Sequence, residues 1–215
     1  MKTTLFAVAV SVSLILCNKA IASPSFTPGN HPQIDEENVL FDQNDTGNPI
    51  WGTTNQSHLT VGFDSTTDLL LAPSNGQARV IANDGSVNDI SVWVPGGYYT
   101  DLIINPFLER DNPGGPATVT VVADDGTFTY DYVGGLGNGN NFLTIVAGNN
   151  EHILKTIVDS AYGFDSLDGF GDLRQPRISG AALDTPNPPS TPEPCTLGLL
   201  GLGGIPLAIR RKKVT

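Results

Sequence analysis

Cysteine, positive charge and histidine are scarce in this sequence. Its 215 residues include two cysteines, three histidines, and 11 lysines and arginines against 22 acidic side chains. Two cysteines cannot build a disulfide framework, and three scattered histidines do not indicate a transition-metal site. The formal charge of −11 argues against general affinity for nucleic acid, whose backbone attracts lysine and arginine.

The N-terminus has the pattern of a secretory signal peptide. Lys2 precedes a short apolar run, Leu5–Cys17, and the small residues Ala20 and Ala22 follow it. A positive start, an apolar core and a small-x-small site are the features that signal peptidase recognises. We therefore predict export and cleavage after Ala22. A retained anchor is the alternative, but the run of 13 residues is short for a membrane span.

Three different segments follow one another at the C-terminus. Pro192, Glu193 and Pro194 come after a proline-rich stretch, residues 195–209 are apolar, and four cations come next: Arg210, Arg211, Lys212 and Lys213. Cations beside an apolar segment favour the cytoplasmic side of a membrane for that end. The residues before the apolar segment would then face outwards, which agrees with a signal peptide.

This order resembles the PEP-CTERM sorting signal of bacterial exosortase substrates, over about the last 24 residues. The resemblance implies recognition near Pro192–Pro194 by an exosortase-like, membrane-embedded transpeptidase that depends on cysteine. It also implies transient anchoring in the inner membrane, removal of the tail, and delivery to the cell surface or extracellular matrix. An ordinary C-terminal anchor without processing is the alternative.

The apolar segment 195–209 is short for a permanent anchor. As a helix, its 15 residues reach about 22 Å, whereas a bilayer core is about 30 Å thick. A short C-terminal apolar helix therefore suits a sorting intermediate. We divide the chain into a signal peptide (1–22), an ectodomain (23–183), a proline-rich linker (184–191) and a sorting signal (192–215). Removal of both ends would leave no cysteine, so core burial must stabilise the mature protein.

The ectodomain has the pattern of a single all-β domain. Short runs rich in valine, isoleucine, threonine and aromatic residues alternate with turn residues, and no useful helical period appears. Their spacing of about ten residues favours an antiparallel β-sandwich or jelly roll. Asp124-Asp125-Gly126 and Asn83-Asp84-Gly85 each predict a hairpin. The predicted strands are Asn38–Asp42, His58–Asp64, Asp68–Ala72, Ala78–Ala82, Asp89–Val94, Tyr99–Asn105, Ala117–Ala123, Thr127–Val133, Phe142–Ala147, His152–Asp159 and Arg174–Ser179.

Motifs of common enzyme classes are missing. The sequence has no Gly-x-Ser-x-Gly or His-Glu-x-x-His motif. The glycine-rich segment 134–139 leads into a predicted strand, whereas a phosphate-binding loop needs a helix behind it, so we predict a mobile glycine turn. We predict no catalytic residues and no enzymatic activity. A glycoside-active enzyme is an alternative, because two carboxyl groups suffice for that reaction.

Calcium is the best-motivated ligand, at Asp165, Asp168 and Asp172. These carboxylates and the glycines between them offer the oxygen ligands that Ca²⁺ prefers, and extracellular calcium can fill weak sites. A solvated acidic loop is the alternative. Thermal unfolding with and without EDTA distinguishes the two, because an unchanged midpoint contradicts calcium binding.

Two groups of side chains are candidates for binding surfaces. One is a sugar-stacking platform, with core packing as the alternative. The other is a flat threonine array of the ice-binding kind, with simple strand surface as the alternative. The aromatic residues are Trp51, Trp93, Tyr98, Tyr99, Tyr130 and Tyr132, and the threonines are Thr118, Thr120, Thr127 and Thr129.

The region between the two ends is more acidic than the whole chain. Residues 23–191 carry five basic and 21 acidic side chains, a net charge of −16. Such a charge favours solubility and points away from anionic polymers unless calcium bridges them. We predict a secreted, exosortase-sorted protein with a structural or adhesive role at the cell surface or in the exopolysaccharide matrix. A carbohydrate-binding module, with calcium as a possible stabiliser, is the alternative.

Overall fold

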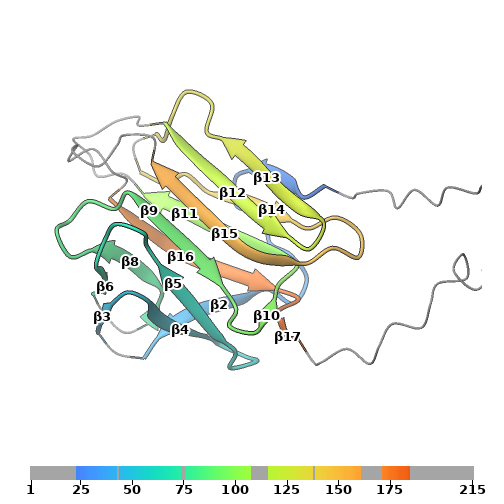
Figure 1. The fold of residues 1–215 in the computed structure, drawn as a ribbon, viewed down its shortest axis with the longest axis horizontal. Coiled ribbons are helices and arrows are strands. Elements are labelled where there is room, and N and C mark those ends of the chain that lie inside the picture. Colours follow the sequence, from blue (N-terminus) through green and yellow to red (C-terminus); the bar gives the residue numbers. More distant parts are fainter. Residues whose placement is uncertain are drawn as a thin grey trace, which may run out of the picture. The chain divides into compact units, whose positions relative to one another are not determined.

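Antiparallel strands account for the regular structure of the residues that the structure describes. The computed structural model describes residues 23–42, 44–73, 76–107, 116–137, 139–160 and 171–184 (Figure 1). The strands are β1 (Ser25–Pro28), β2 (Glu37–Phe41), β3 (Asp45–Gly47), β4 (Ile50–Thr54), β5 (Thr60–Asp64), β6 (Leu70–Ala72), β7 (Gly76–Gln77), β8 (Arg79–Ala82), β9 (Asp89–Trp93), β10 (Gly97–Tyr98), β11 (Asp101–Phe107), β12 (Ala117–Ala123), β13 (Gly126–Asp131), β14 (Leu143–Val146), β15 (Ile153–Ser160), β16 (Asp172–Ser179) and β17 (Ala182–Leu183).

The predicted all-β, antiparallel class is confirmed. All eleven predicted strands are present, and their ends shift by at most two residues. Runs of β-branched and aromatic residues bounded by turn residues were therefore sufficient to find the longer strands. The sequence did not predict β4, which contains Gly52, nor the short strands β1, β3, β7, β10 and β17. The described residues contain no helix that is long and apolar enough to cross a membrane.

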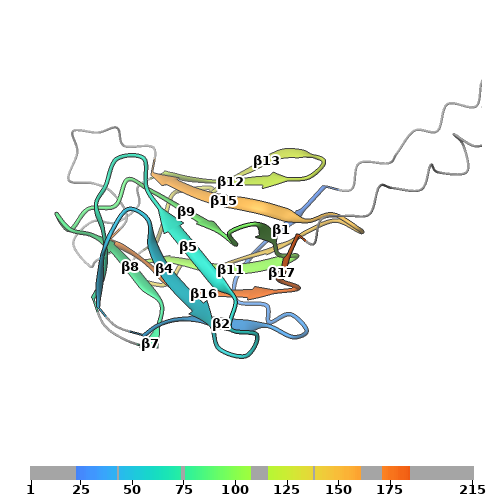
Figure 2. The same cartoon turned by 60° about the horizontal axis from the view of Figure 1, so that its bottom comes forward.

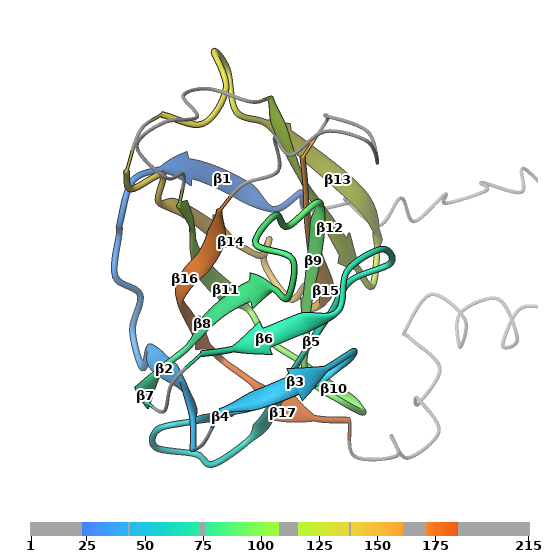
Figure 3. The ribbon, with the colours of Figure 1, turned by 90° about the vertical axis from the view of Figure 1, so that its left-hand side faces the viewer.

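One continuous path of paired strands forms the main sheet, in the order β1-β14-β11-β16-β2-β4-β5-β9-β15-β12-β13. This path curls into a nearly closed barrel (Figure 3), with β12, β15 and β9 across the core from β11 and β16 (Figure 2). At its two ends, the ring of Phe26 in β1 stacks on that of Tyr130 in β13, with centroids 5.6 Å apart. The prediction of two packed sheets did not anticipate this continuity.

The inward faces of the strands form one apolar core. Strand β12 shows the predicted period of two, because Ala117, Val119, Val121 and Ala123 are buried while the residues between them are partly exposed. The largest side chains of the core are fully buried, and burial of each contributes about 1.5–3 kcal/mol. They include Tyr99, Phe63, Ile50, Leu70, Ile90, Leu102, Ile104, Leu143 and Ile145.

The two predicted hairpins have different outcomes. Asp124 and Asp125 form a two-residue loop between β12 and β13, as predicted, because Ala123 pairs with Gly126. The predicted hairpin between β8 and β9 is wrong. Gly85 does close a turn, its N–H donating to the carbonyl of Ala82 at 3.0 Å, but β8 pairs with β6 and β16, whereas β9 pairs with β5 and β15. Turn residues reverse the chain locally and do not choose the partner strand.

The glycine-rich turn after β13 is present and is held by Asn141. The side-chain amide of Asn141 donates to the carbonyls of Gly137 and Pro106, at 2.9 and 3.0 Å, and its oxygen accepts from the Gly137 N–H at 2.6 Å. Leu136 is buried beneath the turn. The sequence pattern from which we predicted a mobile turn did not indicate these contacts, because they come from Asn141, which lies beyond the glycines.

Several predicted residues lie outside the described part of the chain. They are the cleavage-site residues Ala20 and Ala22, the acidic residues Asp165 and Asp168, the motif Pro192, Glu193 and Pro194, the apolar segment, and the cations Arg210, Arg211, Lys212 and Lys213. The corresponding signals stay predictions. The described residues all belong to one unit, Ile21–Thr185.

Candidate functional site

Two tryptophans and a glycine lie in register across three neighbouring strands. Trp51 of β4 is the partner of Gly62 of β5, and Gly62 is in turn the partner of Trp93 of β9. The two indoles stack above the middle strand, with ring centroids 5.1 Å apart and an interplanar angle of 9°. Trp51 keeps 45% of its surface exposed. The pair therefore presents a flat aromatic surface to solvent.

Gly62 makes this stack possible because it has no side chain. A Cβ atom added at Gly62 would lie 1.3 Å from Cζ3 of Trp93, a distance at which the ring must move. The indole of Trp93 therefore covers the backbone of β5 at the position that any other residue would fill. Glycine within a strand often marks such a close approach.

A surface groove of about 400 Å³ adjoins the stack. Its described lining is mostly apolar, and strand β17 brings in Leu183, which pairs with Gly97 of β10. The lining residues, which we call the indole groove, are Trp51, His58, Leu59, Thr60, Pro95 and Leu183. Glycoside hydrolysis ordinarily uses two carboxyl groups, and the described lining holds none. What this lining offers is apolar contact with a few hydrogen-bonding groups at its edge.

The turn that carries His58 into the groove is fixed by Glu37. Its carboxylate accepts hydrogen bonds from the backbone N–H groups of Gln56 and Ser57, at 2.9 and 2.7 Å. Partial burial raises the pKa of Glu37, but the bonds from Ser57 and Gln56 outweigh it and hold the pKa below its ordinary value of 4.5. The carboxylate is therefore ionised at neutral pH, and its stabilisation is complete above its ordinary pKa of 4.5 and is lost progressively as the pH falls from there through the lowered pKa.

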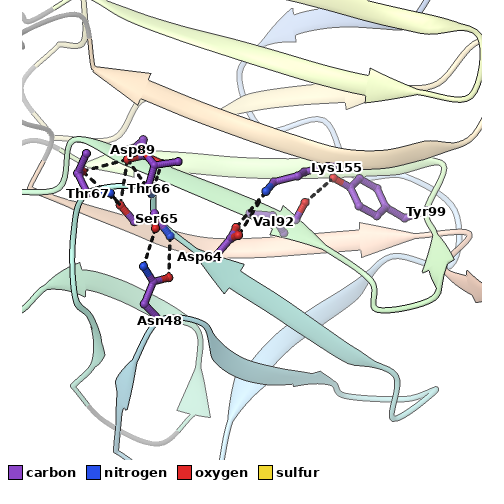
Figure 4. Close-up of polar contacts among 9 residues, drawn as sticks. All are labelled: Asn48, Asp64, Ser65, Thr66, Thr67, Asp89, Val92, Tyr99 and Lys155. Atoms are coloured by element: carbon purple, nitrogen blue, oxygen red, sulfur yellow. Dashed lines mark hydrogen bonds and ion pairs between the residues drawn. The ribbon is translucent and has the colours of Figure 1, made fainter.

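The other predicted aromatic residues do not join this surface. The ring of Tyr98 packs on His152, and Tyr130 meets Tyr132 edge to face at 5.4 Å. Tyr99 is fully buried, and its hydroxyl lies within hydrogen-bond distance of Oγ1 of Thr156, at 2.7 Å, and of the carbonyl of Val92, at 3.2 Å. Figure 4 draws the contact with Val92. The predicted platform therefore reduces to the two tryptophans, and only the register of β4, β5 and β9 shows why.

The predicted threonine array is interrupted. Thr120 and Thr129 face each other across β12 and β13, but Thr118 pairs with Asp131 and Thr127 pairs with Val122. The hydroxyl of Thr118 donates to Asp131 at 2.7 Å instead of extending a threonine row. A regular lattice of hydroxyl groups is not formed by these four residues.

Of the three predicted calcium ligands, the structure describes Asp172. Its side chain is 1% exposed, and its Oδ2 accepts from Nε of Arg174 at 2.7 Å and from Nε of Arg79. Its other oxygen, Oδ1, is also buried and has no hydrogen-bond partner among the described residues. Calcium binding stays a prediction, and the described residues hold no group of three or more His, Cys, Asp or Glu side chains placed for a metal.

A buried acidic cluster that the sequence did not single out lies after β5. The hydroxyl of Ser65 donates to Asp89 at 2.9 Å, and the N–H of Thr66 donates to the same carboxylate at 2.9 Å (Figure 4). Asp68 accepts from the N–H of Asn88 at 2.8 Å. Because hydrogen-bond donors already surround these carboxylates, we infer that they stabilise the turn 65–68 and have no catalytic role.

Comparison with known proteins adds no relative to this geometry. No family model, curated protein or solved structure matches the chain.

Proposed function

We propose that this chain is a secreted protein of the cell surface or exopolysaccharide matrix that adheres to carbohydrate through the indole groove. The observation that carries the proposal is the exposed face of Trp51, held flat by its stack on Trp93 beside an open apolar groove. This proposal combines the two functions expected from the sequence, because a protein that binds glycan through this groove would adhere to the matrix by that binding.

The chemistry of the groove supports a sugar ligand. A sugar ring has a face of C–H groups that packs on an indole, and its hydroxyl groups need a few polar partners at the edge. Trp51 supplies a large apolar face at small conformational cost, while His58 and Thr60 line the same groove with polar atoms. An open groove accommodates an internal segment of a polymer, as matrix adhesion requires.

Replacement of Trp51 by alanine tests the proposal. We expect W51A to lower affinity for the matrix polysaccharide at least tenfold, because the aromatic contact surface is lost and tenfold corresponds to about 1.4 kcal/mol. Affinity electrophoresis or calorimetry on purified exopolysaccharide measures the change. The control is L69A, since Leu69 is 50% exposed, comparable to Trp51, and lies outside the groove lining. Equal binding by wild type and W51A would refute the groove as the adhesive site.

The delivery route is the second part of the proposal, and it rests on the tripartite C-terminus. We propose export by the signal peptide, transient anchoring in the inner membrane, and processing by an exosortase-like enzyme near Pro192–Pro194. Mass spectrometry of the protein isolated from the cell surface should find an N-terminus at Ser23 and a C-terminus close to that motif. A surface protein that is intact through Thr215 contradicts processing.

A further inference from the structure

Two of the few cations of the ectodomain lie side by side. Residues 23–191 contain five basic side chains, and Arg79 of β8 is the register partner of Arg174 of β16. Both line a surface pocket of about 260 Å³ where β7, β8 and β16 meet. We call it the arginine pocket, and its described lining is Gln77, Ala78, Arg79, Arg174 and Gln175.

Like charges directly opposite one another on paired strands repel, so a nearby negative charge stabilises the pair of arginines. Asp172 supplies part of this negative charge, because its buried Oδ2 contacts Nε of both arginines. One carboxylate balances one of the two guanidinium charges. Counted over the described residues, these three side chains therefore leave the pocket a net charge of about +1.

The two guanidinium groups are held in place and keep donors available. The Arg174 guanidinium lies over the ring of Phe107, 3.5 Å from its centroid, and its Nε is bound to Asp172. A guanidinium has five N–H donors, and Nε uses one of them. Among the described residues, no acceptor contacts Nη1 or Nη2 of Arg79 or Arg174. Such fixed, planar forks suit the oxygens of a carboxylate or sulfate.

The backbone at the rim of the pocket is also unusual. Gln175 has a φ of 54°, in the left-handed region that costs a non-glycine residue about 1 kcal/mol. Its N–H donates to the carbonyl of Ala78 at 2.9 Å, which ties β16 to the segment before Arg79. This conformation places a side-chain amide beside the two arginines, where it can contact the uncharged hydroxyl groups of a ligand.

We propose that the arginine pocket binds the anionic group of an acidic polysaccharide, a uronate carboxylate or a sulfate ester. This inference rests on the proposed carbohydrate-binding function and assigns it a ligand class and a second contact, apart from the indole groove. It also reverses the expectation that the acidic domain avoids anionic polymers. The domain meets such a polymer at the place where its positive charge is concentrated.

The test is calorimetric titration of the full chain with hexagalacturonate, with sulfated dextran fragments and with neutral dextran fragments. We expect saturable binding of one charged probe, and which probe binds distinguishes carboxylate from sulfate. R174Q should weaken that binding about tenfold, the loss of one charge-assisted contact. R174K keeps the charge without the fork and should fall between R174Q and wild type.

K155Q is the matched control, because Lys155 is 32% exposed against 29% for Arg174, also pairs with an aspartate, and lies outside the pocket. It should change the affinity less than twofold. R79Q replaces R174Q if the latter does not fold, since Arg174 still pairs with Asp172. No saturable binding of either charged probe would overturn the inference, as would equal weakening by K155Q and R174Q. Neither result affects the W51A test on the indole groove.

Discussion

Replacing Asp89 by asparagine should lower the free energy of unfolding by about 2–4 kcal/mol, the cost of leaving buried donors without a charged acceptor. Asp89 is buried and accepts from the Ser65 hydroxyl, the Thr66 N–H and the Thr67 hydroxyl. The hydroxyl groups of Ser65 and Thr67 reach Oδ1 of Asp89, and the Thr66 N–H reaches Oδ2 at 2.9 Å (Figure 4). Asparagine keeps one oxygen and replaces the other with an N–H₂ group, so one of these two sets of donors loses its acceptor and faces another donor. The turn 65–68 would then lose the group on which it converges.

Asp159 provides the comparison, since it is the register partner of Asp89 on β15 but is exposed where Asp89 is buried. Partial burial and the nearby charge of Asp89 raise the pKa of Asp159. Its charged form is therefore disfavoured in the folded protein. D159N removes a repulsion and should leave stability unchanged or slightly increased. The same change of charge, at directly opposite positions, thus has different consequences.

Urea unfolding followed by circular dichroism at pH 7 measures both variants. The slope with denaturant should stay constant, so that the midpoint reports stability. If D89N and D159N lose the same stability, a general effect of charge explains the result and the acceptor role of Asp89 is wrong.

Alanine at Gly62 should lower the free energy of unfolding by about 1–3 kcal/mol, the usual cost of an overpacked site, and should also weaken glycan binding. The added Cβ occupies the position of the Trp93 ring. Trp93 must then leave the backbone of β5, and Trp51 loses the ring on which it stacks. One methyl group would therefore disrupt both the packing and the proposed carbohydrate-binding surface.

Two further variants isolate this cause. G137A also adds a methyl group, but among the described residues its Cβ would meet only Oδ1 of Asn141, at 3.4 Å, so it should cost much less. In a W93A background, G62A should have little additional effect, because the clashing ring is gone; a double-mutant cycle measures this coupling. If the cost of G62A persists without Trp93, the ring clash does not explain it.

The longer strands and one hairpin could be predicted from the sequence. Strand β12 was found with its exact bounds, because alternation of valine with threonine has a period of two and needs no knowledge of its neighbours. Asp124 and Asp125 marked a tight turn for the same local reason. β4 was missed, because Gly52 interrupts its pattern; that glycine is needed because a Cβ there would lie 2.7 Å from Cγ1 of Val39.

The candidate site was only partly visible beforehand. Trp51 and Trp93 belonged to the predicted group of aromatic residues, but nothing in their sequence positions separates them from Tyr99, which is buried. The arginine pocket had no local signal at all, since Arg79 and Arg174 are 95 residues apart in the chain. Pairing of β8 with β16 brings them together.

The sequence by itself determined what depends on neighbouring residues: an acidic all-β domain, most of its strands, and terminal segments with the pattern of export and sorting signals. Only the tertiary structure decided which strands pair, and hence the stack of Trp51 on Trp93 over Gly62 and the sharing of Asp172 by two arginines. The physical reason is that strand pairing is non-local. Backbone hydrogen bonds are alike for every pair of strands, so the choice of partner follows from how the whole set of side chains fills one core.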